Sequence, residues 1–159
     1  MTYIVHALVI SRLDYCNIVL YGLPKKSIKE LQSVQNAAAR LITRCPKNAN
    51  ITPVLKDLHW LPIQYRLEYK LMCLTFKALH GDAPAYIKDL LQVYKPCRQL
   101  RSSDDNLLSV PRVNLQFGER AFSVAAPKFW NKLPNNVRSS QTLGCFKKQL
   151  KTYLFTQAY

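Results

Sequence analysis

The sequence predicts a mainly α fold, and three observations support that prediction. Apolar residues recur at helical spacing in the runs 24–45, 62–79 and 143–154. Most of the nine prolines lie between these runs, where they separate helices. Only four glycines occur in 159 residues, which disfavours a loop-rich or barrel fold. We therefore expect a helical bundle with at most a small β-hairpin near residues 107–126.

The first predicted helix covers residues 3–21. It ends at the sequence YGLP (residues 21–24), because a glycine commonly ends a helix and Pro24 can open the next one. One side of this helix carries Ile4, Leu8, Ser11, Tyr15 and Val19.

The second predicted helix, residues 24–45, is strongly amphipathic. At about 100° per residue its apolar side holds Leu31, Val34, Ala38, Leu41, Ile42 and Cys45. The opposite side holds Lys25, Lys26, Lys29, Arg40 and Arg44, with Lys47 added if the helix persists. A row of positive charge suits phosphate groups. The alternative is an ordinary solvated face that keeps the helix soluble.

Three shorter signals and one long helix follow. Asn-Ile-Thr-Pro at residues 50–53 begins a short helix to about Leu58, and residues 59–62 form a turn that contains Trp60. The long helix covers residues 62–79 and is apolar around most of its perimeter. Its narrow polar stripe consists of Arg66, Lys70, Cys73 and Lys77. A further helix is predicted at residues 84–92.

The chain changes character after residue 96. Residues 97–106 form a polar loop, residues 107–113 resemble a strand interrupted by Pro111, and residues 117–126 fit either a second strand or a helical turn. The final helix has one apolar face and carries Lys147, Lys148 and Lys151 on the other. We expect segments 1–95 and 96–159 to pack together as one domain.

The charge balance points to a polyanionic partner. The net charge is +14, from 23 basic and 9 acidic residues that are spread along the whole chain. Nucleic acid is the polyanion that such a body most commonly meets. No membrane role is expected, because the apolar run 4–10 is short and is followed at once by Arg12 and Asp14.

Signals for catalysis are weak. The five cysteines show no CxxC and the three histidines lie far apart, so we predict neither a metal nor a cofactor, and we interpret the cysteines as reduced thiols of an intracellular protein. Asp104 and Asp105 are the only adjacent carboxylates; we interpret them as loop residues or partners of Arg98 and Arg101, with a metal-binding pair as the alternative. Trp60 and Trp130 are expected to be buried anchors, with base stacking as the alternative.

Seven ordered blocks carry a family resemblance. They are SRLDYCN (11–17), YGLP (21–24), LQSVQNAAARL (31–41), LHWLP (58–62), FKALHG (76–81), LRSS (100–103) and RAFSVAAP with FWNKLP (120–127 and 129–134). In this order they resemble the C-terminal portion of reverse transcriptases from LINE-type, non-LTR retrotransposons, especially the jockey-like lineages. The resemblance extends over essentially the whole chain.

In such elements this region follows the polymerase palm and is similar to the helical thumb, which packs against the primer–template duplex. The palm and its aromatic-Ala-Asp-Asp motif have no counterpart here, so the resemblance implies a catalytically inactive fragment of an RNA-directed DNA polymerase in the nucleus or cytoplasm. The implied partners are RNA or an RNA–DNA hybrid and the remainder of the reverse transcriptase.

From the helical stripes we predict a nonspecific nucleic-acid contact row of Lys26, Lys29, Arg40, Arg44, Arg66, Lys70 and Lys77. The alternative function is a helical interaction module, in which the helix at residues 3–21 supplies the contact face to another protein or to a second copy.

Overall fold

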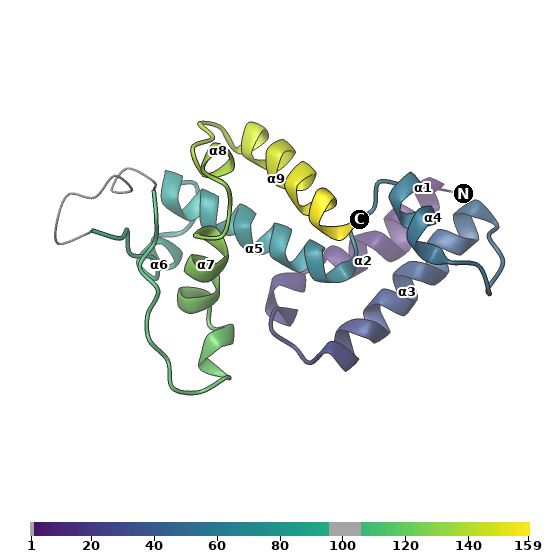
Figure 1. Ribbon diagram of the computed structural model, residues 1–159, viewed down its shortest axis with the longest axis horizontal. Helices are drawn as coiled ribbons and strands as arrows, with labels where there is room; N and C mark the ends of the chain where they lie inside the picture. The colour runs from purple at the N-terminus through teal and green to yellow at the C-terminus, as the bar shows by residue number, and fades with distance from the viewer. Residues whose placement is uncertain (1, 96–105) are drawn as a thin grey trace. The chain divides into compact units, whose positions relative to one another are not determined.

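The computed structural model describes residues 2–95 and 106–159, and it is mainly helical as predicted (Figure 1). The chain divides into two compact units: Met1–Glu68 with Tyr153–Tyr159, and Tyr69–Thr152. This differs from the expected division after residue 95. The boundaries instead fall inside two long helices, α5 (Ile63–His80) and α9 (Leu143–Ala158), each of which supplies residues to both units.

The first unit begins with three consecutive helical segments, α1 (Thr2–Val5), the π-helical turn η1 (His6–Ile10) and α2 (Ser11–Asp14). The single helix predicted for residues 3–21 is wrong beyond Asp14. Tyr15 is extended, Cys16 has a left-handed φ of 48°, and a 3₁₀ turn, η2 (Asn17–Leu20), follows. The amide of Asn17 lies 3.4 Å from Asp14 Oδ1, a local polar contact that competes with helical continuation.

The buried side of this N-terminal segment also differs from the prediction. Val5 and Ile10 are buried, and Val9 and Leu13 are partly buried against them. The apolar side chains expected on the inner face are instead exposed: Ile4, Leu8, Tyr15 and Val19. The π turn, together with the break at Tyr15, shifts the phase of the helix away from a regular 100° per residue.

The basic helix is α3 (Lys25–Thr43), which starts directly after Pro24 as predicted. It ends at Arg44, whose φ of 56° is left-handed, so Lys47 lies outside the helix. The next helix, α4 (Ile51–Asp57), packs against α3. The side chain of Asn50 caps α4 by accepting a hydrogen bond from the backbone of Thr52 at 3.0 Å.

The first unit has one apolar core. Its buried members are Val5, Ile10, Ala38, Ala39, Leu55 and Trp60. His6 meets the indole of Trp60 edge-on at 5.3 Å between ring centroids, and Tyr159 donates a hydrogen bond to the Trp60 carbonyl at 2.6 Å. The predicted apolar side of α3 is only partly inside, because Val34 and Leu41 are exposed while Gln35 is fully buried.

The second unit contains the later part of α5, α6 (Ala85–Lys88), η3 (Gly118–Arg120), α7 (Phe122–Trp130) and α8 (Asn135–Arg138), and the first part of α9. Residues 107–126 hold no hairpin. Leu108 forms an isolated antiparallel bridge with Val93 instead, and residues from 118 onward are largely helical. The helix predicted at residues 84–92 is shorter than expected.

The core of this unit is a stack of aromatic rings. The Phe76 and Phe146 centroids are 4.4 Å apart, and those of Trp130 and Phe146 are 5.8 Å apart. The indole N–H of Trp130 donates to the Asn106 carbonyl at 2.8 Å. Trp60 and Trp130 are both buried, so the prediction of tryptophan anchors is confirmed and neither ring is available for base stacking.

Candidate nucleic-acid interface

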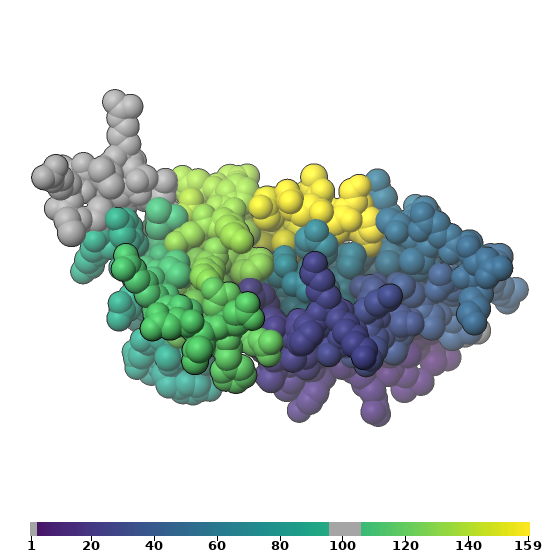
Figure 2. All heavy atoms as spheres, turned by 60° about the horizontal axis from the view of Figure 1, so that its bottom comes forward, coloured from purple at the N-terminus to yellow at the C-terminus, as the bar shows by residue number. Residues whose placement is uncertain are grey.

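The basic side of α3 faces outward in the structure. Lys25, Lys26 and Lys29 are exposed, whereas the fully or nearly fully buried residues of α3 lie on the opposite side. Figure 2 shows the early residues of α3, in dark blue, standing at the surface. We call Lys25, Lys26 and Lys29 the α3 row. The sequence therefore places these cations correctly, although it assigns Val34 and Leu41 to the wrong environment.

The two arginines of α3 extend this row unequally. Arg40 is half-buried: its Nη2 lies 3.4 Å from the Ala49 carbonyl, while its Nε is buried without a hydrogen-bond partner. Arg44 is exposed at the left-handed end of the helix. Arg44 can meet a phosphate without rearrangement, whereas Arg40 also serves the loop before α4.

Arg66 occupies a different place from the one expected for a phosphate contact. Its Nη1 lies 2.8 Å and 2.9 Å from the two carboxylate oxygens of Asp14, and its Nε donates to the Leu61 carbonyl at 3.0 Å. Only 14% of the side chain is exposed. Arg66 is therefore an internal ion-pair residue, and we remove it from the contact row.

Glutamines in the LQSVQN run join α3 to the start of α5. Gln35 donates to the Leu61 carbonyl at 2.9 Å, and Gln32 accepts a hydrogen bond from the backbone of Ile63 at 2.8 Å. Gln32 also donates to Gln35 at 2.9 Å. These bonds satisfy polar groups at the start of α5 and fix the direction from which α3 presents its lysines.

A second basic cluster lies in the second unit around Cys73. Burial raises the pKa of the Cys73 thiol, while the hydrogen bond with Tyr69 and the charges of Lys147, Lys70 and Lys77 act to lower it. Lys70 and Lys147 are exposed, and Lys77 is half-buried. We call Lys70, Lys77 and Lys147 the Cys73 cluster. The structure thus confirms that two lysines of the α5 stripe gather together, and it adds Lys147 from α9.

The sequence could not place Lys147 beside α5. It is visible as one of three lysines on the polar face of the last helix, but helical periodicity gives no information about which helix that face meets. The α3 row belongs to the first unit and the Cys73 cluster to the second, so each is a separate candidate surface. Asp104, Asp105, Arg98 and Arg101 lie outside the described residues.

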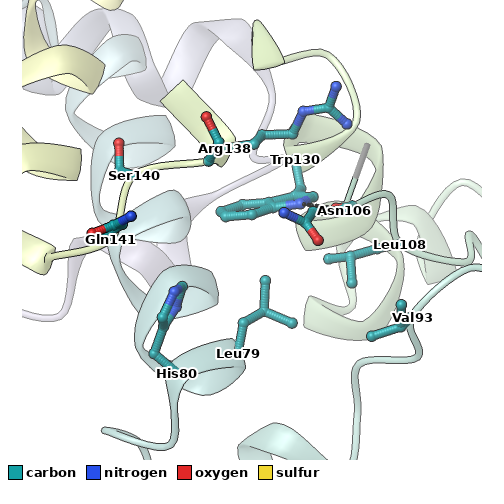
Figure 3. Close-up of a pocket in the computed structure, with 10 residues that line it drawn as sticks. Leu79, His80, Val93, Asn106, Leu108, Trp130, Arg138, Ser140 and Gln141 are labelled. Carbon is teal, nitrogen blue, oxygen red and sulfur yellow. Dashed lines mark hydrogen bonds between the residues drawn. The ribbon is translucent and has the colours of Figure 1, made fainter. Parts of the chain in front are cut away.

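The second unit also contains a cavity of about 330 Å³ (Figure 3). Leu79, Leu108 and Trp130 supply much of its apolar lining, and Arg138 and Ser140 also border it. Its polar side chains are engaged in packing, since Ser140 donates to the Val137 carbonyl and His80 Nδ1 lies 2.9 Å from the Phe76 carbonyl. This arrangement holds the aromatic core and presents no nucleophile with an adjacent base.

Other site types were sought in the same regions. Across residues 2–95 and 106–159, no three His, Cys, Asp or Glu side chains come together in a way that would bind a metal ion. Within those ranges no helix has the length and apolar character needed to cross a membrane. Comparisons with protein-family models, curated proteins and solved structures found no match.

Proposed function

We propose that this chain binds nucleic acid without sequence preference, by contacting phosphates with the α3 row and the Cys73 cluster. The observation that carries the proposal is the outward row of Lys25, Lys26 and Lys29 on a helix whose opposite side is buried. Cations held on a rigid helix at this spacing meet successive phosphates without ordering a flexible loop.

The charge distribution favours this function over an ordinary solvated face. The second unit alone contains 14 basic and 5 acidic residues, so the excess is a property of the folded body. Ion pairs found among the described residues join Arg66 to Asp14 and Lys128 to Glu119. Neither pair uses a member of the α3 row or of the Cys73 cluster, which leaves both surfaces suited to an external anion.

We further propose that the chain derives from the region after the palm of a LINE-type reverse transcriptase and has no polymerase activity of its own. Support comes from contacts between the blocks that carry the resemblance. Gln32 and Gln35 of the third block hold Leu61 of the fourth and Ile63 just after it. Asp14 of the first block pairs with Arg66, four residues after the fourth. The blocks therefore behave as parts of one structural unit.

The test is the salt dependence of binding to a labelled RNA–DNA hybrid, followed by fluorescence anisotropy between about 50 mM and about 200 mM salt. The expected result is a steep loss of affinity. The double variant K26Q/K29Q should lower the slope of log K against log salt by about 2, because each lost phosphate contact removes about one released counterion.

Two further variants complete this experiment. K70Q/K77Q/K147Q reports on the Cys73 cluster, and K128Q is the matched control, because Lys128 pairs with Glu119 at 2.8 Å. An affinity that does not change with salt would overturn the phosphate model. Equal losses for K128Q and K26Q/K29Q would assign binding to overall charge and would count against the α3 row.

A second candidate function is a helical interaction module. One observation favours it: the N-terminal segment leaves Ile4, Leu8 and Tyr15 exposed although they are large and apolar. Surfaces of this kind mark protein contacts when they are contiguous. This function is compatible with nucleic-acid binding, because it uses a different part of the first unit.

A further inference from the structure

The N-terminal helical segment exposes a continuous stripe that includes large apolar side chains. Tyr3 is 90% exposed, Ile4 60% and Leu8 62%. Ala7 and Ser11 are also exposed and follow at helical spacing, so the five residues share one side of the segment. We call Tyr3, Ile4, Ala7, Leu8 and Ser11 the N-terminal stripe.

The other side of the same segment anchors it firmly. Val5 and Ile10 are 4% exposed and belong to the core that includes Ala38 and Ala39 of α3. The segment is therefore apolar around its circumference, as is usual for helices that are buried on all sides. The core fixes the position of the stripe, so a partner can bind without paying to order it.

The charge pattern identifies the occupant. Residues 2–11 contain no Lys, Arg, Asp or Glu, in a chain whose net charge is +14. Two copies that met through most other faces would bring like charges together, whereas two N-terminal stripes meet without repulsion. A nucleic acid or an acidic protein would bind the lysine surfaces instead, because the stripe offers it no cation.

We propose that a second copy of this chain covers the N-terminal stripe, so that the protein forms a two-fold symmetric dimer through paired N-terminal helices. The same patch serves both copies, as a closed two-fold interface requires. The stripe contains none of the α3 row, which stays free in the dimer. Two rows on one particle bind a long duplex more tightly than one row does, through effective concentration.

The experiment is sedimentation equilibrium of the whole chain in reducing buffer, from about 1 μM to about 100 μM, a range suited to an interface of few residues. Reductant excludes disulfide-linked dimers through the exposed Cys16 and Cys145. The wild type should dimerise as concentration rises, and I4K/L8K should stay monomeric with unchanged helical circular dichroism. A wild type that is monomeric throughout would overturn the proposal.

The matched control is V34K/L41K, which adds the same charge at apolar residues of α3 that are 48% and 58% exposed. It should dimerise like the wild type. An equal loss of dimer in the control would reveal a general effect of added charge and would count against the stripe.

A mixing experiment gives a positive signal even if single variants lose stability. L8K and L8E should each be monomeric alone, because a symmetric pair would bring two like charges together. Mixed in equal amounts they should form a heterodimer, which native mass spectrometry distinguishes from either parent. Failure to associate on mixing, with both variants folded, would contradict a symmetric contact at Leu8.

Discussion

Arg66 and Asp14 form a two-point ion pair that joins α5 to α2, with Arg66 Nη1 2.8 Å from Oδ2 and 2.9 Å from Oδ1. The same guanidinium also donates to the Leu61 carbonyl. One side chain thus ties the N-terminal segment, the turn after α4 and the start of α5 together. This geometry explains why a residue on a basic helical stripe is largely withdrawn from solvent.

Replacing Arg66 should reduce stability and leave nucleic-acid affinity nearly unchanged. We expect R66A to lower the free energy of unfolding by about 2–3 kcal/mol, because Asp14 and the Leu61 carbonyl lose a shared donor in a partly buried site. Urea unfolding measures the loss. R66K keeps the charge without the fork geometry and should recover only part of the stability. A large fall in affinity for folded R66K would return Arg66 to the contact row.

Gln35 should be the most sensitive polar residue of α3. It is fully buried and bonds to Leu61 and Gln32. We expect Q35A to cost about 2–4 kcal/mol in unfolding free energy, because it leaves a cavity and an unsatisfied amide. The exposed Gln64 is the control, and Q64A should change stability by less than about 0.5 kcal/mol. Similar effects of the two variants would contradict the polar network.

Lys147 should control the acidity of the Cys73 thiol. Its positive charge lowers the pKa of Cys73, although burial has the larger and opposite effect. Removing the charge in K147Q should raise that pKa further and slow alkylation of Cys73 near pH 9. Peptide mass spectrometry after timed iodoacetamide treatment measures the rate. K148Q, at the adjacent position, is the control and should react at the wild-type rate.

Alkaline pH should destabilise the fold. Burial is the main cause that raises the pKa values of Cys73, Tyr69 and Tyr159 above their ordinary values. Each group therefore keeps its proton longer when folded, so its stabilising contribution is complete below the unfolded pKa and falls as pH rises through the folded one. Urea midpoints should decline from about pH 9 upward. C73V should flatten the first part of that decline; a midpoint that rises above pH 9 would refute the assignment.

Asn131 should be needed as an amide. Its side chain accepts from the Leu108 backbone N–H at 2.9 Å and donates to the Leu108 carbonyl at 2.8 Å. N131D keeps the size and loses the donor, so we expect a loss of about 1–3 kcal/mol at neutral pH. Thermal unfolding measures it. N136D, at an exposed position on α8, is the comparison and should be nearly neutral.

Much of the helical plan is visible in the sequence because its signals are local. Pro24 and the Cys45–Pro46 step bracket α3, and Asn50 caps α4, as the chain chemistry predicts. The break at Tyr15 was not visible, because the apolar pattern continues through it. The polar contact between Asn17 and Asp14 leaves no mark on the hydrophobic period.

The candidate site divides in the same way. The α3 row follows from periodicity within one helix and was predicted. The removal of Arg66 and the addition of Lys147 depend on pairs far apart in the chain, Arg66 with Asp14 and Lys147 with Cys73. Such pairs are set by tertiary packing, about which a single sequence carries little information.

The first unit is assembled from both ends of the chain. Tyr159 donates to the Trp60 carbonyl and Tyr65 donates to the Gln157 carbonyl, both within that unit. During synthesis these acceptors and donors are therefore far apart in time, since a ribosome makes the whole second unit before it adds residues 153–159. The segment made first is closed last, and a nascent chain stalled before residue 153 would leave the edge of the Trp60 core open to chaperones and proteases.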